Sequence, residues 1–252
     1  MLSDQEFMRY SRQLLLEDVS PEGQLQLKNS KVLIVGLGGL GSPASLYLAG
    51  AGVGEIWLAD HDELHVSNLQ RQMLYNTDDI SKSKAQLAAH RLNQLNPLIK
   101  THVLQKKLDI DTLIPLVAQV DLVLDCCDNM ATRHAVNMAC VKTNKTLISG
   151  SAVGFGGQLM VFEPPFSSGC YACLYPENEE PQRNCRTAGV LGPVVGIIGT
   201  LQALEAIKLL VGLPSSLSGK LRLFDGKQQH WNTLQLTPSM QCSICREETC
   251  IS

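Results

Sequence analysis

The sequence has almost no excess charge, and this argues against one broad class of partner. Its 21 lysines and arginines are nearly balanced by 24 aspartates and glutamates, so the formal net charge is −3. Proteins that bind nucleic acid carry a basic patch that neutralises phosphates. We therefore expect no nucleic acid among the partners of this protein.

Segments that direct a chain to a membrane are also scarce. We identify no apolar run of the length that spans a bilayer, and we expect no membrane association. The first residues, Met1–Glu6, lack the basic and apolar regions of a signal peptide. A cytoplasmic protein is the expectation. Disulfides are rare in that compartment, so metal ligands or reactive thiols explain nine cysteines better than disulfides do.

The N-terminal half is organised around an apolar run that ends in a glycine-rich turn. Val32–Val35 predict a buried strand, and the residues from Gly36 to Gly41 match the pattern G-x-G-x-x-G before a predicted helix over 42–50. Glycines at this spacing let the backbone approach a phosphate, and the helix N-terminus adds unpaired N–H donors. A second predicted strand ends in Asp60, where the pattern places the acceptor for a ribose hydroxyl. The turn therefore predicts a nucleotide site.

The glycine pattern leaves the kind of nucleotide open. Ser42 and Pro43 follow the last glycine, so the Lys-Ser/Thr pair of a Walker P-loop is absent. A long polar stretch follows Asp60, and such loops at the carboxyl ends of parallel strands commonly bind ligands. Its amides and arginine favour a triphosphate or a peptide end, and a solvated loop is the alternative. The candidate residues in this stretch are Asp62, Ser67, Asn68, Leu69, Gln70, Arg71 and Gln72.

The start of a later predicted helix and the loop after a later predicted strand add candidates for phosphate and metal contacts. Lys84 lies in the first turn of a predicted helix, where a cation opposes the helix dipole unless an anion is close. Asp125, Asp128 and Asn129 follow a predicted strand, and their oxygens suit a magnesium ion shared with phosphates. Asp125 could instead satisfy backbone groups locally, so Asp128 is the favoured magnesium ligand.

Strands and helices alternate through the first 150 residues. The predicted strands are 32–35, 55–60, 99–104, 120–124 and one that begins at 147, and the helices between them are 42–50, 81–95, 109–119 and 130–143. This alternation predicts an α/β fold with a Rossmann-like, mainly parallel sheet and helices on both faces. Before the first strand, residues 3–28 predict one or two amphipathic helices, broken at 21–23, that bury Leu14, Leu15, Leu16, Leu25 and Leu27.

From Ser151 onward the pattern changes. The predicted elements are strands over 158–162, 221–224 and 231–236 and a long helix over 190–211. We expect an antiparallel C-terminal part that continues the sheet. The helix is apolar almost all round, so it must be covered on several sides, and a subunit interface is one way to cover it.

Four cysteines are spaced as metal ligands. Cys170 and Cys173 form one C-x-x-C knuckle, and Cys242 and Cys245 form a second. Two such knuckles supply the four thiolates of a tetrahedral structural zinc site. A thioredoxin-like redox pair is the alternative for one knuckle, but it does not explain two. A zinc ion held in this way would tie the end of the chain to its middle.

One further cysteine is a candidate nucleophile. Cys185 lies between Arg183 and Arg186 in a segment too polar and proline-rich for a core. Adjacent cations favour the thiolate, which is the reactive form. An ordinary loop cysteine is the alternative.

Taken together, these motifs resemble a known family. Residues 10–13 (Tyr-Ser-Arg-Gln), the glycine turn, residues 67–72, Asp128-Asn129 and the two knuckles are similar to the ThiF/MoeB/HesA family, whose members are relatives of the ubiquitin-activating enzymes. The resemblance covers nearly the whole chain. Residues 154–158 and 183–189 are most similar to the ThiF branch, whose members adenylate the thiamine sulfur carrier ThiS.

The resemblance implies a reaction and a set of roles. ATP and the C-terminal glycine carboxylate of a small ubiquitin-like carrier would give an acyl-adenylate and pyrophosphate. It also implies a cysteine desulfurase or another sulfur donor as a partner, a homodimer, and a single domain made of parts 1–28 (arginine finger), 29–150 (nucleotide binding) and 151–252 (carrier binding and zinc).

Individual residues take roles from the same resemblance. Gly39 and Gly41 would lie against the phosphates, and Asp60 would bind the ribose. The phosphates would also be contacted by Asn68, Arg71 and Lys84, with Gln72 nearby. Asp128 would hold Mg²⁺, and Asn129 would shape that pocket. Arg12 would act as an arginine finger in the partner's site. Cys170, Cys173, Cys242 and Cys245 would bind Zn²⁺, and Cys185 would serve sulfur transfer.

Three other functions remain as alternatives. A MoeB-like enzyme would adenylate the sulfur carrier subunit of molybdopterin synthase. An NAD-dependent oxidoreductase is favoured only by the glycine turn and Asp60, and Arg12, Arg71 and Lys84 argue against it. A non-catalytic scaffold would bind a ubiquitin-like tail without chemistry.

Overall fold

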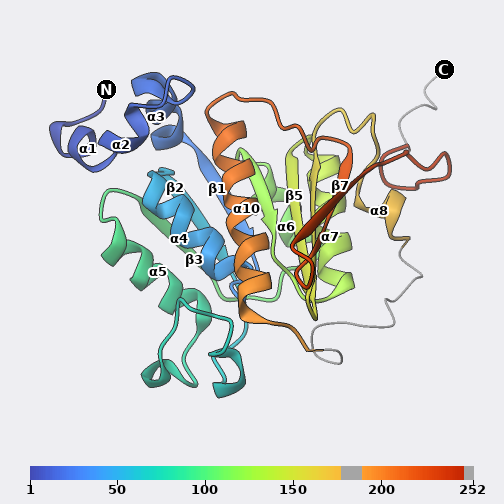
Figure 1. Ribbon diagram of the computed structural model, residues 1–252, viewed down its shortest axis with the longest axis horizontal. Helices are drawn as coiled ribbons and strands as arrows, with labels where there is room; N and C mark the ends of the chain where they lie inside the picture. Colours follow the sequence, from blue (N-terminus) through green and yellow to red (C-terminus); the bar gives the residue numbers. More distant parts are fainter. Residues whose placement is uncertain (177–188, 247–252) are drawn as a thin grey trace.

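A computed structural model describes residues 1–176 and 189–246, and within them one mixed sheet forms the centre of the protein. The strand order is β3-β2-β1-β4-β5-β6-β7-β8. The strands are β1 (Lys31–Val35), β2 (Glu55–Ala59), β3 (Lys100–Leu104), β4 (Leu122–Asp125), β5 (Thr146–Val153), β6 (Gly156–Phe162), β7 (Lys220–Asp225) and β8 (His230–Gln235). The pairs from β3 to β5 are parallel and those from β5 to β8 are antiparallel, which confirms the expected fold class (Figure 1).

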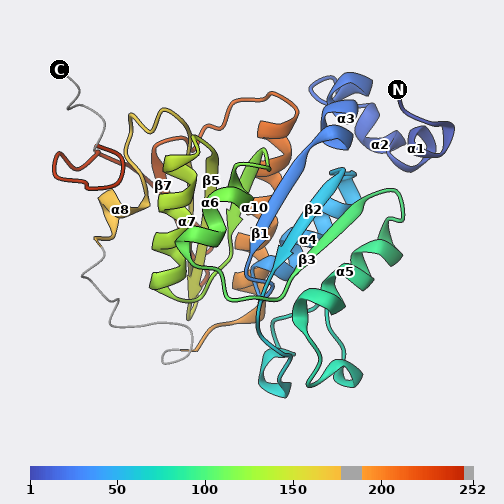
Figure 2. The same cartoon turned by 180° about the vertical axis from the view of Figure 1, so that it is seen from behind.

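Helices cover both faces of this sheet. The described helices are α1 (Asp4–Arg9), α2 (Ser11–Leu14), α3 (Ser20–Asn29), α4 (Gly41–Ala51), α5 (Lys84–Leu95), α6 (Ile110–Val117), α7 (Met130–Lys142), α8 (Tyr171–Leu174) and α10 (Gly192–Leu210), with 3₁₀ turns η1 (Val66–Asn68) and η2 (Thr77–Asp79). In Figures 1 and 2, α4, α5 and α10 lie on one face and α6 and α7 on the other. Alternate residues of β1 feed the two cores: Val32 and Ile34 belong to one apolar cluster, and Leu33 and Val35 to the other.

The N-terminal helices differ from the expectation in two ways. Leu15 and Leu16, predicted to be buried, are 73% and 57% exposed. Pro21, predicted to break a helix, lies in the first turn of α3, where its missing N–H costs no hydrogen bond. Amphipathic spacing alone could not show that α2 ends at Leu14, before these leucines.

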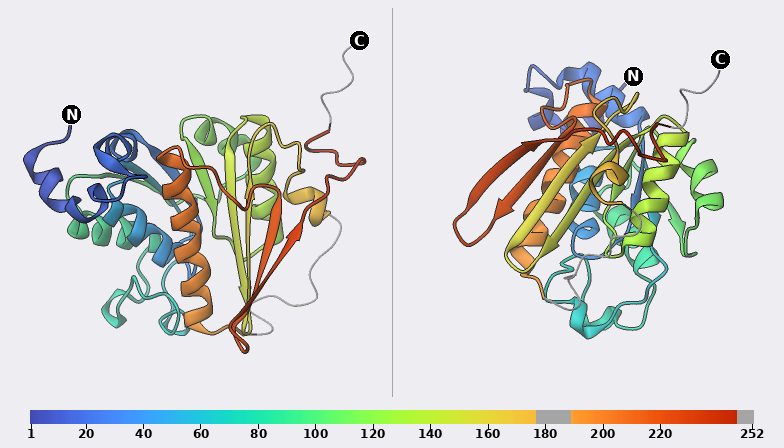
Figure 3. Two further views of the ribbon diagram at one scale, coloured as in Figure 1. Left: turned by 45° about the horizontal axis from the view of Figure 1, so that its top comes forward. Right: turned by 90° about the vertical axis from the view of Figure 1, so that its right-hand side faces the viewer.

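The long C-terminal helix corrects a second expectation. α10 has 19 residues and is long and apolar enough, by length and composition, to cross a membrane, so the expectation that no apolar run reaches that length is wrong. Its apolar composition has a structural cause, because α10 packs against α4, β5 and β6 along the sheet (Figure 3). Ile197 and Leu204 nevertheless remain 38% and 48% exposed.

The sheet runs continuously through the suggested division of the chain. β5 spans Thr146–Val153, so the boundary at residues 150 and 151 lies within a strand. That strand pairs in parallel with β4 on one side and antiparallel with β6 on the other. The nucleotide-binding part and the C-terminal part therefore share one sheet.

Candidate active site and metal centre

The glycine turn after β1 adopts a backbone path that side chains would block. Gly36 has φ +93°, and a Cβ there would lie 2.6 Å from the carbonyl oxygen of Cys126. A Cβ on Gly41 would overlap the carbonyl oxygen of Gly36 itself. A Cβ on Gly39 would lie 3.1 Å from Val195 of α10. The three glycines thus let the turn fold tightly between β4 and α10 at the N-terminus of α4, which is the geometry of a phosphate cradle.

Asp60 braces this turn from the end of β2. Its Oδ2 accepts a hydrogen bond from the backbone N–H of Leu37 at 2.7 Å, and its Oδ1 accepts one from Asp62 at 2.8 Å. Burial raises the pKa of Asp60, whereas Lys84 and these two N–H donors act to lower it. Each carboxylate oxygen has two lone pairs, so Asp60 can still accept a ribose hydroxyl. It is therefore a structural part of the turn as well as a candidate ligand residue.

Lys84 is buried and paired with a carboxylate. It is the first residue of α5, is 5% exposed, and its Nζ lies 3.3 Å from Asp62 Oδ2. The nearby anion offsets the unfavourable position of a cation at a helix N-terminus. The side chain of Asp62 is 46% exposed, so this carboxylate remains largely in water.

Residues 67–72 form a second wall of the candidate site, and Gln72 at its end lies next to Gly38 of the glycine turn. Arg71 Nη1 donates to the carbonyl oxygen of Ser67 at 2.9 Å, and Asn68 Oδ1 accepts from the N–H of His65 at 3.1 Å. Leu69 packs against the apolar core, so its side chain is structural, and the side chain of Gln70 is exposed. The start of α10 is held against this wall, because a Cβ on Gly192 would lie 2.6 Å from the carbonyl oxygen of Gln70.

Gln72 supplies the clearest sign that a ligand belongs here. The residue is 3% exposed, and its Oε1 has no hydrogen-bond partner among the described residues. Its Nε2 lies 3.4 Å from the position that a Cβ on Gly38 would occupy. A buried, unsatisfied acceptor is costly unless a donor arrives with a ligand. The glycine cradle and this acceptor together fit a nucleotide.

The loop after β4 completes the predicted set. Asp125 takes the structural role that the sequence left open: it is buried and ion-paired with Arg133 at 2.9 Å. Asp128 is exposed at the carboxyl end of the sheet, next to the glycine turn, and its carboxylate oxygens suit Mg²⁺. Asn129 caps α7, since its Oδ1 accepts from Thr132 N–H at 2.9 Å. Arg133 was not predicted, and the only signal was a charged residue one turn after Asn129 in a largely apolar helix.

Arg12 lies away from these residues. The adjacent Gln13 bonds the carbonyl oxygen of Ala51, at the C-terminus of α4, whereas the glycine turn is at the N-terminus of the same helix. The 11 residues of α4 separate the two ends by about 16 Å. The structure therefore does not bring Arg12 into the site of its own chain. Cys185 lies outside the described residues.

The four knuckle cysteines come together as predicted. Their Sγ atoms all lie within 4.8 Å of one another, with Cys170–Cys242 at 3.7 Å and Cys173–Cys245 at 3.5 Å. Four thiolates around zinc at about 2.3 Å place the sulfurs about 3.8 Å apart, so the cluster fits a tetrahedral ion. Burial raises the pKa of Cys170 to about 11, and a bound cation would counter this by stabilising the thiolate.

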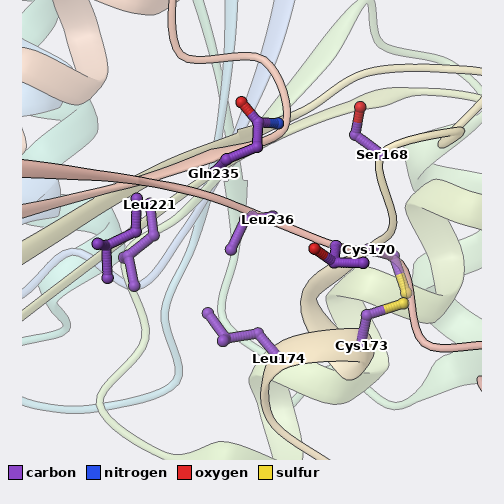
Figure 4. A pocket seen from close by; sticks show the side chains of 9 residues that line it. Ser168, Cys170, Cys173, Leu174, Leu221, Gln235 and Leu236 are labelled. Carbon is purple, nitrogen blue, oxygen red and sulfur yellow. The ribbon is translucent and has the colours of Figure 1, made fainter.

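Helix α7 supports this cluster through Asn137, another residue that the sequence did not single out. Asn137 is buried, its Nδ2 donates to Cys170 Sγ at 3.5 Å, and its Oδ1 accepts from Tyr171 N–H at 2.9 Å. Figure 4 shows Cys170 and Cys173 with their sulfurs side by side, next to a cavity of about 150 Å³ that Leu174, Leu221 and Leu236 help to line. The cavity is smaller than ordinary ligand pockets.

Comparison with known proteins identifies the family. The ThiF family model matches residues 10–244, which is nearly the whole chain. The chain belongs to the ThiF family. The sulfur carrier protein ThiS adenylyltransferase of Escherichia coli is 59% identical over 244 residues, covering 97% of each chain. Across the family the relatives differ in length and in name.

Two further relatives illustrate that range. The adenylyltransferase and sulfurtransferase MOCS3 of Culex quinquefasciatus is 44% identical over 98% of this chain, which spans 57% of that relative's length. The crystal structure of E. coli MccB with ATP superposes with a TM-score of 0.79 at 28% identity, covering 94% of this chain and 73% of MccB. The fold is therefore shared by ThiF-family members of different length.

Replacing Asn137 by leucine should weaken metal binding by the cluster. Loss of a hydrogen bond to a ligand thiolate lowers metal affinity, so zinc should pass to a colorimetric chelator about ten-fold faster. The wild-type protein, purified without chelator, should contain about one zinc per chain if four thiolates hold it. Asn96→Leu is the control, because Asn96 is equally buried but bonds Tyr10 and Ala49. Equal release rates in the two variants would contradict the role of Asn137.

Proposed function

We propose that this protein adenylates the C-terminal glycine of a small ubiquitin-like sulfur carrier, a ThiS-like protein, and so prepares it for thiocarboxylate formation in thiamine thiazole synthesis. A full-length relative with 59% identity, named as a ThiS adenylyltransferase, supports the reaction and the carrier. The MccB structure crystallised with ATP supports the nucleotide. Three features carry the proposal: the glycine cradle, the buried Lys84 whose charge acts on Asp60, and the buried Gln72 Oε1 beside Gly38, which has no hydrogen-bond partner in the described part of the chain.

The proposed chemistry suits a site without a general base. The C-terminal carboxyl group of a polypeptide ordinarily titrates with a pKa of about 3.3–3.7, so that of the carrier is already an anion at neutral pH. One carboxylate oxygen forms a bond to the α-phosphorus of ATP while the bond to the bridging oxygen breaks and pyrophosphate leaves. No proton moves, so the enzyme must hold anions together and stabilise the charge of the leaving group.

The residues of the site are suited to that task. Gly39 and Gly41 open the backbone toward the phosphates, Arg71 and Lys84 supply fixed positive charge, and Asn68 and Gln72 supply polar contacts. Asp128 would hold Mg²⁺, which neutralises phosphate charge when bound. Asp60 would accept from the ribose while it braces the turn. An NAD-dependent oxidoreductase would not need these cations.

A second carrier remains a specific alternative. The MOCS3 relatives, named as adenylyltransferases and sulfurtransferases, are 42–44% identical over 97–100% of this chain, and a MoeB-like enzyme that serves the molybdopterin carrier is the alternative that we keep. The thiamine carrier is favoured because the identity to the ThiS adenylyltransferase is higher, 59%, and covers 97% of each chain. The sulfur donor, a cysteine desulfurase or another protein, would act after adenylation.

We also propose that the protein works as a homodimer. Ile197 and Leu204 are exposed apolar residues on α10, and α4, which packs against α10, exposes Tyr47 at 57%. A second copy that covers this face would remove the apolar residues from water. The distance between Arg12 and the site of its own chain fits an arginine that reaches across such an interface.

Carrier-dependent exchange of pyrophosphate into ATP tests the reaction directly. Arg71→Ala and Asp128→Ala should each lower the exchange rate at least about 100-fold, the usual effect of removing one group that stabilises developing charge. Asp111→Ala, an exposed acid in the first turn of α6, should leave the rate unchanged.

The same assay separates the alternatives. Exchange with a ThiS-like carrier, but not with a molybdopterin-type carrier, would support the thiamine assignment, and the reverse would support the MoeB-like enzyme. Unchanged exchange in both site variants would count against the assigned residues. A change in nicotinamide absorbance without any exchange would support an oxidoreductase instead.

Mixed dimers test whether Arg12 acts across the interface. Arg12→Ala and Asp128→Ala should each be inactive, but co-refolded together they should regain about a quarter of wild-type exchange, because half of the dimers are mixed and each has one intact site. Arg71→Ala mixed with Asp128→Ala is the control, since both residues belong to one site and no intact site can form. Equal recovery in the two mixtures would mean that Arg12 acts within its own chain.

Cys185 is proposed to link covalently to the carrier: its thiolate attacks the carbonyl carbon of the acyl-adenylate, a thioester forms, the bond to the phosphate oxygen breaks and AMP leaves. Cys185→Ser should keep pyrophosphate exchange but lose any enzyme–carrier adduct seen by intact-mass spectrometry under non-reducing conditions, because serine lacks the thiolate nucleophile. Cys250→Ser serves as the matched control and should retain the adduct. An adduct that persists in Cys185→Ser would overturn this role.

A further inference from the structure

The side chain of one arginine on α7 bonds groups of two other elements of the fold. Arg133 is 6% exposed, and its Nη1 bonds Asp125 Oδ2 at 2.9 Å and Ser149 Oγ at 3.1 Å. Its Nη2 donates to the carbonyl oxygen of Gly150 at 2.7 Å and to that of Cys127. The guanidinium therefore joins the loop after β4 to the neighbouring strand β5.

The peptide groups around Cys127 are held from two sides. The N–H of Cys127 donates to Asp125 Oδ1 at 3.0 Å, and its carbonyl oxygen accepts from Arg133. Asp125 is itself fixed, because Ser149 Oγ donates to its Oδ2 at 2.7 Å and the side chain of Gln202 donates to its carbonyl oxygen at 2.8 Å. The carbonyl that Arg133 holds belongs to the peptide bond whose N–H is that of Asp128.

A guanidinium is suited to this position in a way that an ammonium is not. Its planar fork presents five donors in fixed directions, so it can bind a carboxylate, a hydroxyl and two carbonyl oxygens together. A lysine would keep the charge next to Asp125 but could not span both carbonyl groups. Because Asp125 and Arg133 neutralise each other, neither brings net charge to the phosphates.

We propose that Arg133 is a positioning residue for the adenylation reaction. By holding the Cys127–Asp128 peptide, Arg133 would fix the position of the Asp128 carboxylate, the residue that would hold the Mg²⁺ that neutralises phosphate charge. Arg133 is 6% exposed and would act only through this peptide, without contacting ATP or the carrier. The inference rests on the proposed function for the identity of the reaction, but its effect on Mg²⁺ and ATP binding is independent of any carrier.

Arg133→Lys separates positioning from folding. The variant leaves Asp125 paired with a cation, so we expect a folded protein with wild-type near-ultraviolet circular dichroism and zinc content. The Mg²⁺ concentration for half-maximal ATP binding should rise, and kcat for exchange should fall about 100-fold, as for other small misplacements of reacting groups. The KM for the carrier should not change, because Arg133 does not touch it.

Two further variants make the result specific. Asp125→Asn combined with Arg133→Gln removes both charges at once, so no unpaired charge is left buried, and it should show the same defect in Mg²⁺ dependence. It serves as the test protein if Arg133→Lys does not fold. Arg91→Lys is the matched control, because Arg91 pairs with the buried Asp79 at 3.2 Å away from the loop, and its Mg²⁺ dependence should be that of the wild type.

The outcomes distinguish this inference from the proposed function. Isothermal titration measures the binding of ATP with Mg²⁺ in the absence of carrier. If the wild-type protein binds MgATP but none of the carriers supports pyrophosphate exchange, the proposed function fails. A shift in the Mg²⁺ dependence of ATP binding in the Arg133 variants would still support the positioning role of Arg133. A folded Arg133 variant with lowered thermal stability but unchanged Mg²⁺ dependence and kcat would overturn the positioning role.

Discussion

The close approach of β1 and β4 at Gly36 is the constraint on which the rest of the site depends. No side chain fits there, since a Cβ would lie 2.6 Å from the carbonyl oxygen of Cys126. The absence of a Cβ lets the turn after β1 rest directly on the loop after β4. Through this one contact the glycine turn and Asp128 come to the same edge of the sheet, although about 90 residues separate them in sequence.

Helices on opposite faces of the sheet hold the two parts of this edge, which are the glycine turn with residues 67–72 and the loop after β4. On one face α10 presses on the glycine turn at Gly39 and on the 67–72 wall at Gly192. On the other face α7 holds the loop after β4 through Arg133 and the four-cysteine cluster through Asn137, about one turn of helix apart. The four-cysteine cluster and the loop that carries Asp128 are thus attached to the same helix.

Local chemistry made much of this arrangement predictable. The strand, the G-x-G-x-x-G turn and the helix that follows it are determined by residues close together in sequence. The spacing within two C-x-x-C knuckles predicts four metal ligands. Arg133 and Asn137 carried no such pattern, because what they bond is set by the packing of α7 against β5 and α8. The prediction that Leu15 and Leu16 are buried was wrong because it also depended on tertiary packing. Helical periodicity does not show where a short helix ends or which of its faces packs against the rest of the protein.

The two buried cations of the candidate site, Lys84 and Arg133, differ in how exposed their partner carboxylates are. Arg133 pairs with Asp125, whose side chain is 1% exposed, so separating them would strand a charge in the interior. Lys84 pairs with Asp62, whose side chain is 46% exposed and returns to water at little cost. Under the proposed function, Lys84 would exchange its carboxylate for an incoming phosphate, while Arg133 would stay in place. A cation whose partner carboxylate is exposed, such as Lys84, is suited to binding substrate. A cation whose partner carboxylate is buried, such as Arg133, is suited to holding a loop.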